Sequence, residues 1–293
     1  MTKKIVAAYG ISVALLLISI WCGISIGSVS VPISTLWDAE SNPTAYSILW
    51  NIRMPRVVLA ALVGAALAIA GAAFQGLLKN PLADPYTLGI SSGASVGAVF
   101  TLFFGVSLPV FGFFTLPIFS MIGAFVTLVV VMGFARLVDR TMKMETLILT
   151  GIIFSSFLGS CISLMIALTG EELRSIMGWL LGSVSMRGWP YVKMILPFVL
   201  IGALILWLHR RELNAMIYGE ERAKYLGVDV KRSKYIILIG GSMLTGAAVA
   251  VSGTIGFVGL VVPHMVRMVL GADHRHLLII SFFNGASLLV ICD

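Results

Sequence analysis

Long apolar stretches separated by short polar segments run through the whole chain. Most stretches approach or reach the roughly 20 residues that a helix needs to cross the hydrocarbon core of a bilayer. We place the predicted spans at 5–31, 57–78, 86–108, 110–135, 146–168, 190–208, 235–255, 256–270 and 277–292. Several are short or interrupted by glycine, which membrane helices use where their backbones approach closely. The pattern predicts an all-α, polytopic membrane helix bundle with about nine spans.

Three connections between spans have a distinctive pattern. Segment 80–85 has two prolines and two polar side chains directly after an apolar stretch, so its backbone cannot continue as a regular helix. Segment 253–259 is too short for a full polar loop, and we expect a tight turn there that leads into a shortened helix. Segment 32–52 contains Pro32 and Pro43, and we expect a short structured connection at the outer face.

The composition supports a membrane protein built as one domain. Of the 293 residues, 59% are hydrophobic and only 11% are charged, which is too few charges to cover a water-facing globule of this size. No linker or charge block leaves room for a second soluble domain, so residues 1–293 form a single transmembrane domain.

The net charge of +7 is better explained by a lipid bilayer than by nucleic acid. If the N-terminus is cytoplasmic, 15 of the 20 basic residues fall in inner segments. The outer basic residues are then Arg53, Arg56, Arg174, Arg187 and Lys193. This excess on one side follows the positive-inside rule, so we predict a cytoplasmic N-terminus.

The longest inner segment, 209–234, mixes both signs of charge with apolar residues. It predicts short amphipathic helices at the cytoplasmic face, with a solvated loop as the alternative. A phosphate-binding P-loop requires a Gly-Lys-Ser/Thr sequence, and none of the eight lysines follows a glycine. The chain therefore contains no ATPase site of that type, and a motor has to be a separate subunit.

A set of motifs that covers essentially the whole chain, in the same order, resembles the FecCD-like permease family. This family comprises the ABC importers of iron-siderophores, haem and cobalamin. The motifs are Arg53-Met54-Pro55-Arg56, the glycine-rich run 64–76, Asn80-Pro81-Leu82-Ala83-Asp84-Pro85, Leu88-Gly89 with Ser91-Ser92-Gly93-Ala94, Gly178-Trp179 with Gly182-Ser183, segment 223–228, segment 257–264 with Arg267, and Asp273-His274-Arg275.

The resemblance implies a ten-helix subunit that works as a homodimer in a bacterial cytoplasmic (inner) membrane. Its partners would be two ATP-binding subunits, which hold ATP and Mg, and an extracytoplasmic substrate-binding protein. The chain itself would bind no cofactor. Because the sequence stops at Asp293, before the last helix of the family pattern, we expect that a tenth helix is missing.

Three groups of residues are candidates for function. Arg53 and Arg56 are predicted to dock the binding protein, because arginine pairs well with carboxylates, although interfacial anchoring is an alternative. The coupling residues predicted to contact the ATPase are Ala223, Tyr225, Leu226, Gly227 and Val228. The residues considered for the translocation pathway are Gln75, Asn80, Ser91 and Ser92. For Gln75 and Asn80 helix–helix hydrogen bonding is the alternative, and for the serines it is close packing at a helix start.

Other functions have less support. Residues 89–93 match the Gly-x-Ser-x-Gly pattern of hydrolases, but that elbow requires a strand-to-helix turn, and here a loop enters a membrane helix. His264 is more easily read as a structural residue, and His274 and His276 do not share a helix face, so we predict no metal site. A secondary ion-coupled transporter usually has carboxylates at midspan, whereas nearly all Asp and Glu residues here fall at loops. We therefore expect an importer of iron–siderophore complexes, with haem or cobalamin as alternative substrates.

Overall fold

The computed structural model describes residues 2–27, 35 and 42–293. All regular elements in this part of the chain are helices, in the order α1 (Thr2–Ser25), α2 (Pro43–Ser47), η2 (Ile48–Arg53), α3 (Met54–Leu77), η3 (Pro85–Leu88), α4 (Ile90–Phe103), η4 (Gly112–Phe114), α5 (Thr115–Val138), α6 (Met144–Leu168), α7 (Leu173–Leu180), α8 (Trp189–Leu208), α9 (Arg210–Ile217), α10 (Glu220–Tyr225), α11 (Val230–Ser252), α12 (Val258–Leu270) and α13 (His274–Cys292). The all-α prediction is confirmed.

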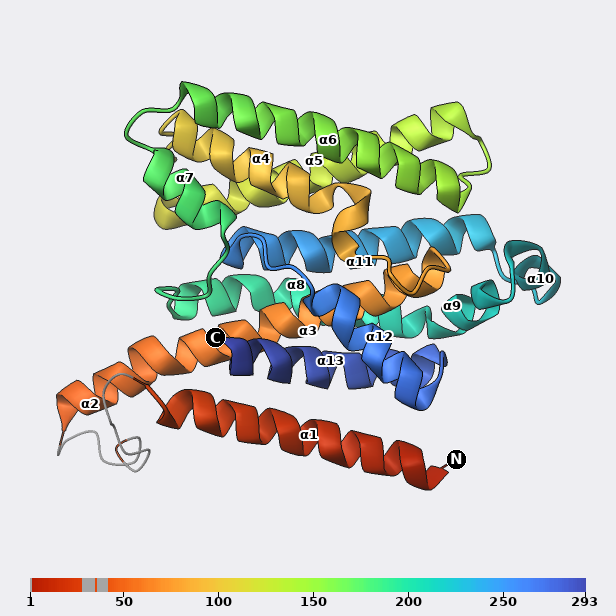
Figure 1. Ribbon diagram of the computed structural model, residues 1–293, viewed down its shortest axis with the longest axis horizontal. Coiled ribbons are helices and arrows are strands. Elements are labelled where there is room, and N and C mark those ends of the chain that lie inside the picture. The colour runs from red at the N-terminus through yellow and green to blue at the C-terminus, as the bar shows by residue number, and fades with distance from the viewer. Residues whose placement is uncertain (1, 28–34, 36–41) are drawn as a thin grey trace.

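The predicted spans correspond one to one to helices in the described residues. Seven helical segments are long and apolar enough to cross a membrane, by length and composition, and two shorter apolar helices, Ile90–Phe103 and Val258–Leu270, supply the remaining two. The long helices lie roughly side by side, with α6 at one edge of the molecule and α1 at the other (Figure 1).

Helices α3 and α11 form the centre of the bundle. Most of each helix is buried, whereas almost all of α1 and α6 faces outward. Close packing depends on small residues: a Cβ added to Gly71 would overlap the carbonyl oxygen of Gly259 in α12, and one added to Gly64 would overlap that of Gly285 in α13. Gly64 and Gly71 therefore lie at backbone-to-backbone contacts, as is typical of small residues in membrane helices.

The two predicted breaks are confirmed. Helix α3 ends at Leu77, and regular α-helix resumes only at Ile90, after turns and the 3-10 helix η3. Helices α11 and α12 are separated by a turn in which Gly253 and Phe257 have φ angles of 71° and 68°. The hydroxyl group of Tyr86 joins the two irregular segments, because it donates to the Ile255 carbonyl at 2.6 Å and accepts from the Ile255 amide at 3.2 Å.

The predicted connection at 32–52 differs from the structure in its described part. Residues 32–34 and 36–41 lie outside the described residues, but Pro43–Leu77 is one continuous helical segment of 35 residues. A proline inside a helix removes one backbone hydrogen bond, and here the wider π-helical turn η2 ends at Arg53, two residues before Pro55, and accommodates it. Arg53 and Arg56 consequently lie within a long helix rather than at its start.

Candidate functional site

The segment predicted to couple to an ATPase forms two short helices, α9 and α10, at one end of the bundle (Figure 1). Leu213 and Met216 of α9 and Ala223 of α10 are buried against the rest of the fold. The amphipathic helices expected from the sequence are therefore confirmed, and the apolar face of the segment holds it on the bundle.

The turn after α10 presents apolar side chains to the outside. Tyr225 is 89% exposed and Leu226 is 70% exposed, whereas Val228 is half-buried. Gly227 adopts φ 82°, and its amide and that of Val228 donate to the carbonyls of Lys224 and Ala223 at 2.9 and 3.0 Å. These two bonds make a Schellman cap, which requires the left-handed conformation that glycine adopts most easily. The cap fixes the direction in which the two exposed side chains project.

A polar contact fastens α9 to the start of α13. The Asn214 side-chain amide donates to Asp273 at 2.6 Å, and its carbonyl oxygen accepts from the His274 amide at 2.8 Å. Partial burial would raise the pKa of Asp273, but hydrogen bonds from the Arg275 amide and from Asn214 outweigh it, and the pKa is lowered. The carboxylate therefore stays ionised and keeps accepting these bonds.

The two arginines predicted to dock a partner have different environments. Arg53 is buried and donates from Nη1 to the carbonyl oxygens of Ile24 and Ser25 at the end of α1, at 2.9 and 3.2 Å. Arg56 exposes 38% of its side chain and pairs with the Asp293 carboxylate at 2.6 Å. In this arrangement Arg53 holds α1 to the long helix, and Arg56 is the more accessible of the two.

The candidate pathway residues do not form one cluster of exposed groups. Gln75 is buried, and its side-chain nitrogen donates to the Leu260 carbonyl at 3.0 Å, which joins α3 to α12. Asn80 is exposed in the turn after α3 and accepts from the Leu82 amide at 3.0 Å. Ser91 is buried in the first turn of α4 and Ser92 is half-buried. For Gln75 the structure shows the helix–helix hydrogen bond that we considered as the alternative to a pathway role.

Sequence reasoning did not identify a row of serines on α6. Ser156, Ser160 and Ser163 are exposed on this mostly apolar helix. The hydroxyl groups of Ser156 and Ser160 donate to carbonyls one turn earlier, at 3.0 Å each. The signal was present in the sequence, because the spacing of four and three residues places all three on one helix face.

The described residues offer no support for a hydrolase or a metal site. Residues 89–93 pass from η3 through Gly89, at φ 79°, into α4, so the Gly-x-Ser-x-Gly sequence starts a helix and follows no strand. Within the same residues no group of three or more His, Cys, Asp and Glu side chains could hold a metal ion. Nδ1 of His264 is buried and has no hydrogen-bond partner among the described atoms.

Comparisons with known proteins place this geometry in a family. The FecCD transport family model matches residues 15–293. An uncharacterized ABC transporter permease protein of Bacillus subtilis, YvrB, is 59% identical over 98% of this chain and 84% of its own length. The hemin transport system permease protein HmuU of Yersinia pestis is 39% identical over 92% of this chain and 80% of its own length.

A solved structure has the same fold. It is an ABC transporter in an inward-facing conformation and is described as of the metal-chelate type. The match covers 100% of this chain and 90% of the other chain, with a TM-score of 0.86 and 31% sequence identity. Other relatives, at 35–42% identity, are named as permeases for cobalamin, molybdate and Fe(3+) dicitrate. The chain belongs to the FecCD transport family and is a permease of an ABC transporter.

Proposed function

We propose that this chain is the membrane subunit of an ABC importer that carries iron–siderophore complexes across a bacterial cytoplasmic membrane. The observation that carries this proposal is the exposed turn at Tyr225 and Leu226, which is held in a fixed direction by the Gly227 cap. Two large apolar side chains at the polar end of a membrane protein favour a protein partner, because aromatic and apolar anchors dominate such contacts. An ATP-binding subunit at this turn fits a permease that carries no P-loop.

The arrangement of the helix ends supports a cytoplasmic N-terminus. The start of α1 and the segment α9–α10 lie at the same end of the molecule (Figure 1). This end holds Lys3, Lys4 and most of the basic residues between 209 and 234, as the positive-inside rule requires of a cytoplasmic face. The ATPase would therefore bind inside the cell, where ATP is available, and the binding protein would dock at the opposite end.

The exposed face of α6 supports a homodimer around a central pathway. Although Ser156 and Ser160 donate within the helix, each hydroxyl group keeps acceptor lone pairs on the exposed surface, which water in a pathway satisfies better than hydrocarbon does. A second copy facing Ser156, Ser160 and Ser163 across a two-fold axis would enclose a channel lined by hydroxyl groups and small residues. Gln75, Asn80, Ser91 and Ser92 would then contribute only near the inner end of the pathway.

Ion coupling has less support than coupling to ATP. In the described helices that could cross a membrane, no Asp or Glu lies at midspan, and Glu145 is only the second residue of α6. Ion-coupled transporters usually bind their ion through such carboxylates.

The choice of substrate is supported by the names of the relatives and not by a binding pocket. Relatives are named for hemin, cobalamin, molybdate and Fe(3+) dicitrate, so large chelates predominate, and the similar solved transporter is described as of the metal-chelate type. We therefore favour an iron chelate, with haem or cobalamin as alternatives. Calorimetry on the binding protein that works with this chain tests the choice: the ferric siderophore is expected to bind at least tenfold tighter than hemin, cobalamin or molybdate. If hemin, cobalamin or molybdate binds more tightly than the ferric siderophore, that ligand is the substrate and the proposal of an iron–siderophore complex is wrong.

Docking of the binding protein is expected to depend on Arg56. Its guanidinium group is accessible and can exchange Asp293 for a partner carboxylate, in charge-assisted bonds that contribute about 1.5–3 kcal/mol each. Arg56→Glu should therefore weaken docking at least about tenfold at low salt, and the difference should shrink at high salt because exposed ion pairs are screened. Arg53→Glu should instead lower the amount of folded protein, since it puts a carboxylate beside the carbonyls that end α1.

The matched control is Arg174→Glu, which makes the same change at an exposed residue of α7. Docking by surface plasmon resonance on nanodiscs, at two salt concentrations, compares the three variants. If Arg56→Glu docks as tightly as Arg174→Glu at low salt, Arg56 is a structural or interfacial residue and the docking surface lies elsewhere.

A further inference from the structure

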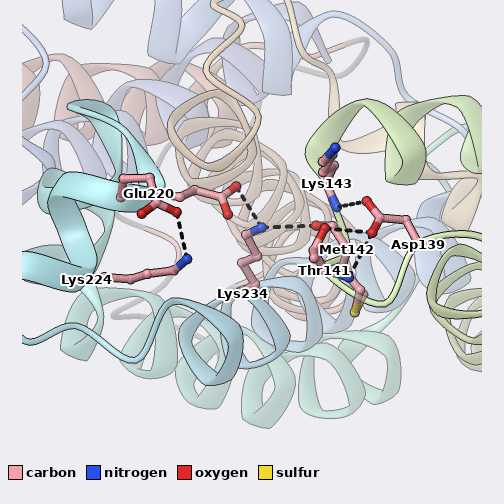
Figure 2. A network of polar contacts seen from close by, with 8 residues as sticks. Asp139, Thr141, Met142, Lys143, Glu220, Lys224 and Lys234 are labelled. Carbon is pink, nitrogen blue, oxygen red and sulfur yellow. Dashed lines mark hydrogen bonds and ion pairs between the residues drawn. The ribbon is translucent and has the colours of Figure 1, made fainter.

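Lys234 occupies a buried position between two cytoplasmic elements. It lies in the first turns of α11, and its side chain is only 3% exposed. Its Nζ is 2.7 Å from the Glu220 carboxylate of α10 and donates to the Met142 carbonyl, between α5 and α6, at 3.0 Å. Figure 2 shows the ammonium group between these two partners, one from each side. Buried lysines are rare because desolvation of the charge is costly, so this placement requires both partners.

The turn that receives the second contact is held together by its own hydrogen bonds. Asp139 accepts from the amide and hydroxyl of Thr141 at 2.9 and 2.7 Å, and from the Lys143 amide at 3.3 Å. These hydrogen bonds lower the pKa of Asp139, and the bond from the Thr141 hydroxyl has the largest effect. Asp139 therefore stays ionised and keeps accepting them. Met142 is buried at φ 50°, a conformation that few residues other than glycine adopt, and its amide donates to the Asp139 carbonyl at 3.0 Å.

A nearby ion pair, between Lys224 and Glu221, is exposed to water, whereas the Lys234 ammonium group is buried. Lys224 and Glu221, on the same short helix, approach to 2.8 Å, but their side chains are 58% and 78% exposed. Exposed pairs of this kind contribute little, because water and salt screen them. Lys234 is shielded from water, and it connects α11, α10 and the turn between α5 and α6. Of these two lysines, only Lys234 can therefore hold separate elements together.

The geometry points to Lys234 as a positioning residue that fastens the coupling segment to the α5–α6 turn, so that α10 and the start of α6 move as one unit. The inference rests on the proposed function, in which an ATPase binds at Tyr225 and Leu226 and α6 lines the pathway. Movement of the ATPase contact would pass from α10 through Glu220, Lys234 and the Met142 carbonyl to α6, which begins two residues later at Met144.

A distance measurement tests the link directly. Spin labels at Arg222→Cys on α10 and Arg140→Cys on the turn, both exposed positions, report the separation of the two elements in the full chain in nanodiscs. The native Cys22, Cys161 and Cys292 are replaced beforehand. Lys234→Gln is expected to at least double the width of the distance distribution. Lys231→Gln removes the same charge from an exposed position of the same helix and should leave the width unchanged.

A second variant covers the case in which Lys234→Gln does not fold. Glu220→Ala removes a side chain that is 31% exposed and leaves Lys234 bound to Met142, so it cuts only the contact to α10. It should widen the distribution in the same way. A distribution as narrow as wild type in either folded variant would overturn the inference.

The functional readout is uptake per ATP hydrolysed, with the ATPase and binding protein present. Both variants should lower this ratio at least fivefold while the ATPase subunit binds with unchanged affinity, because the force reaches α10 but not α6. A ratio equal to that of Lys231→Gln would contradict the link. If the wild-type chain binds no ATPase at all, the proposed function fails, whereas the spin-label distances still decide whether Lys234 holds the two elements.

Discussion

Leu226→Asp is expected to abolish ATP-driven uptake while the protein still inserts into the membrane. Leu226 is 70% exposed, so the change costs the fold little, but it puts a charge where an apolar anchor should contact the ATPase. The loss of such an anchor typically costs about 2 kcal/mol or more, which weakens binding roughly 30-fold. Pull-down of the ATPase and uptake in proteoliposomes measure the two consequences.

Gly227→Pro should have the same effect by a different route. Gly227 has φ 82° and donates its amide to the Lys224 carbonyl, whereas proline is held near −65° and has no amide hydrogen. The cap is lost and the exposed side chains change direction. The control is Met186→Asp, in an exposed apolar residue between α7 and α8, away from the coupling segment. Normal ATPase binding and uptake by Leu226→Asp would show that the turn is not the coupling surface.

Gly71→Leu is expected to prevent the bundle from packing. A Cβ at this position would overlap the carbonyl oxygen of Gly259, and a backbone atom cannot move aside as a flexible side chain can. Overpacking a core costs roughly 1–3 kcal/mol when neighbours can adjust, and here the two helix backbones must separate. We expect little monodisperse protein in detergent, and a lower midpoint of thermal unfolding in what remains.

The matched control for this change is Gly133→Leu in α5. Gly133 is exposed, and a Cβ there would meet no atom within 4 Å. Both glycines lie in apolar helices, so the comparison separates the contact from the general effect of glycine on helix propensity. Equal yield and equal thermal midpoints for the two variants would mean that α3 and α12 do not approach closely at Gly71.

The sequence predicted most of the fold because its strongest signals are local. Apolar stretches located the helices, and the prolines of 80–85 and the glycines of 253–259 located the breaks. The two short helices of segment 209–234 were also predictable, since charged and apolar residues are mixed there over a long stretch. These features depend on residues close together in the chain, so they require no knowledge of the packing.

What could not be predicted depends on residues far apart in the chain. The burial of Arg53 is set by the carbonyls of Ile24 and Ser25 at the end of α1, 29 and 28 positions away. Lys234 looked like one more basic residue of the inner segment, because its partner Met142 lies 92 positions away. The serines of α6 could have been found from their spacing, but the sequence does not tell that the helix face they share is exposed.

The most direct test of the central claim is ATP-dependent uptake by the purified components. Proteoliposomes would contain this chain and its partner ATP-binding subunit, with the binding protein and a radiolabelled ferric siderophore outside. We expect uptake that requires ATP inside and the binding protein outside, and that is insensitive to collapse of proton and sodium gradients. Uptake that proceeds without ATP and stops when a gradient is collapsed would contradict it.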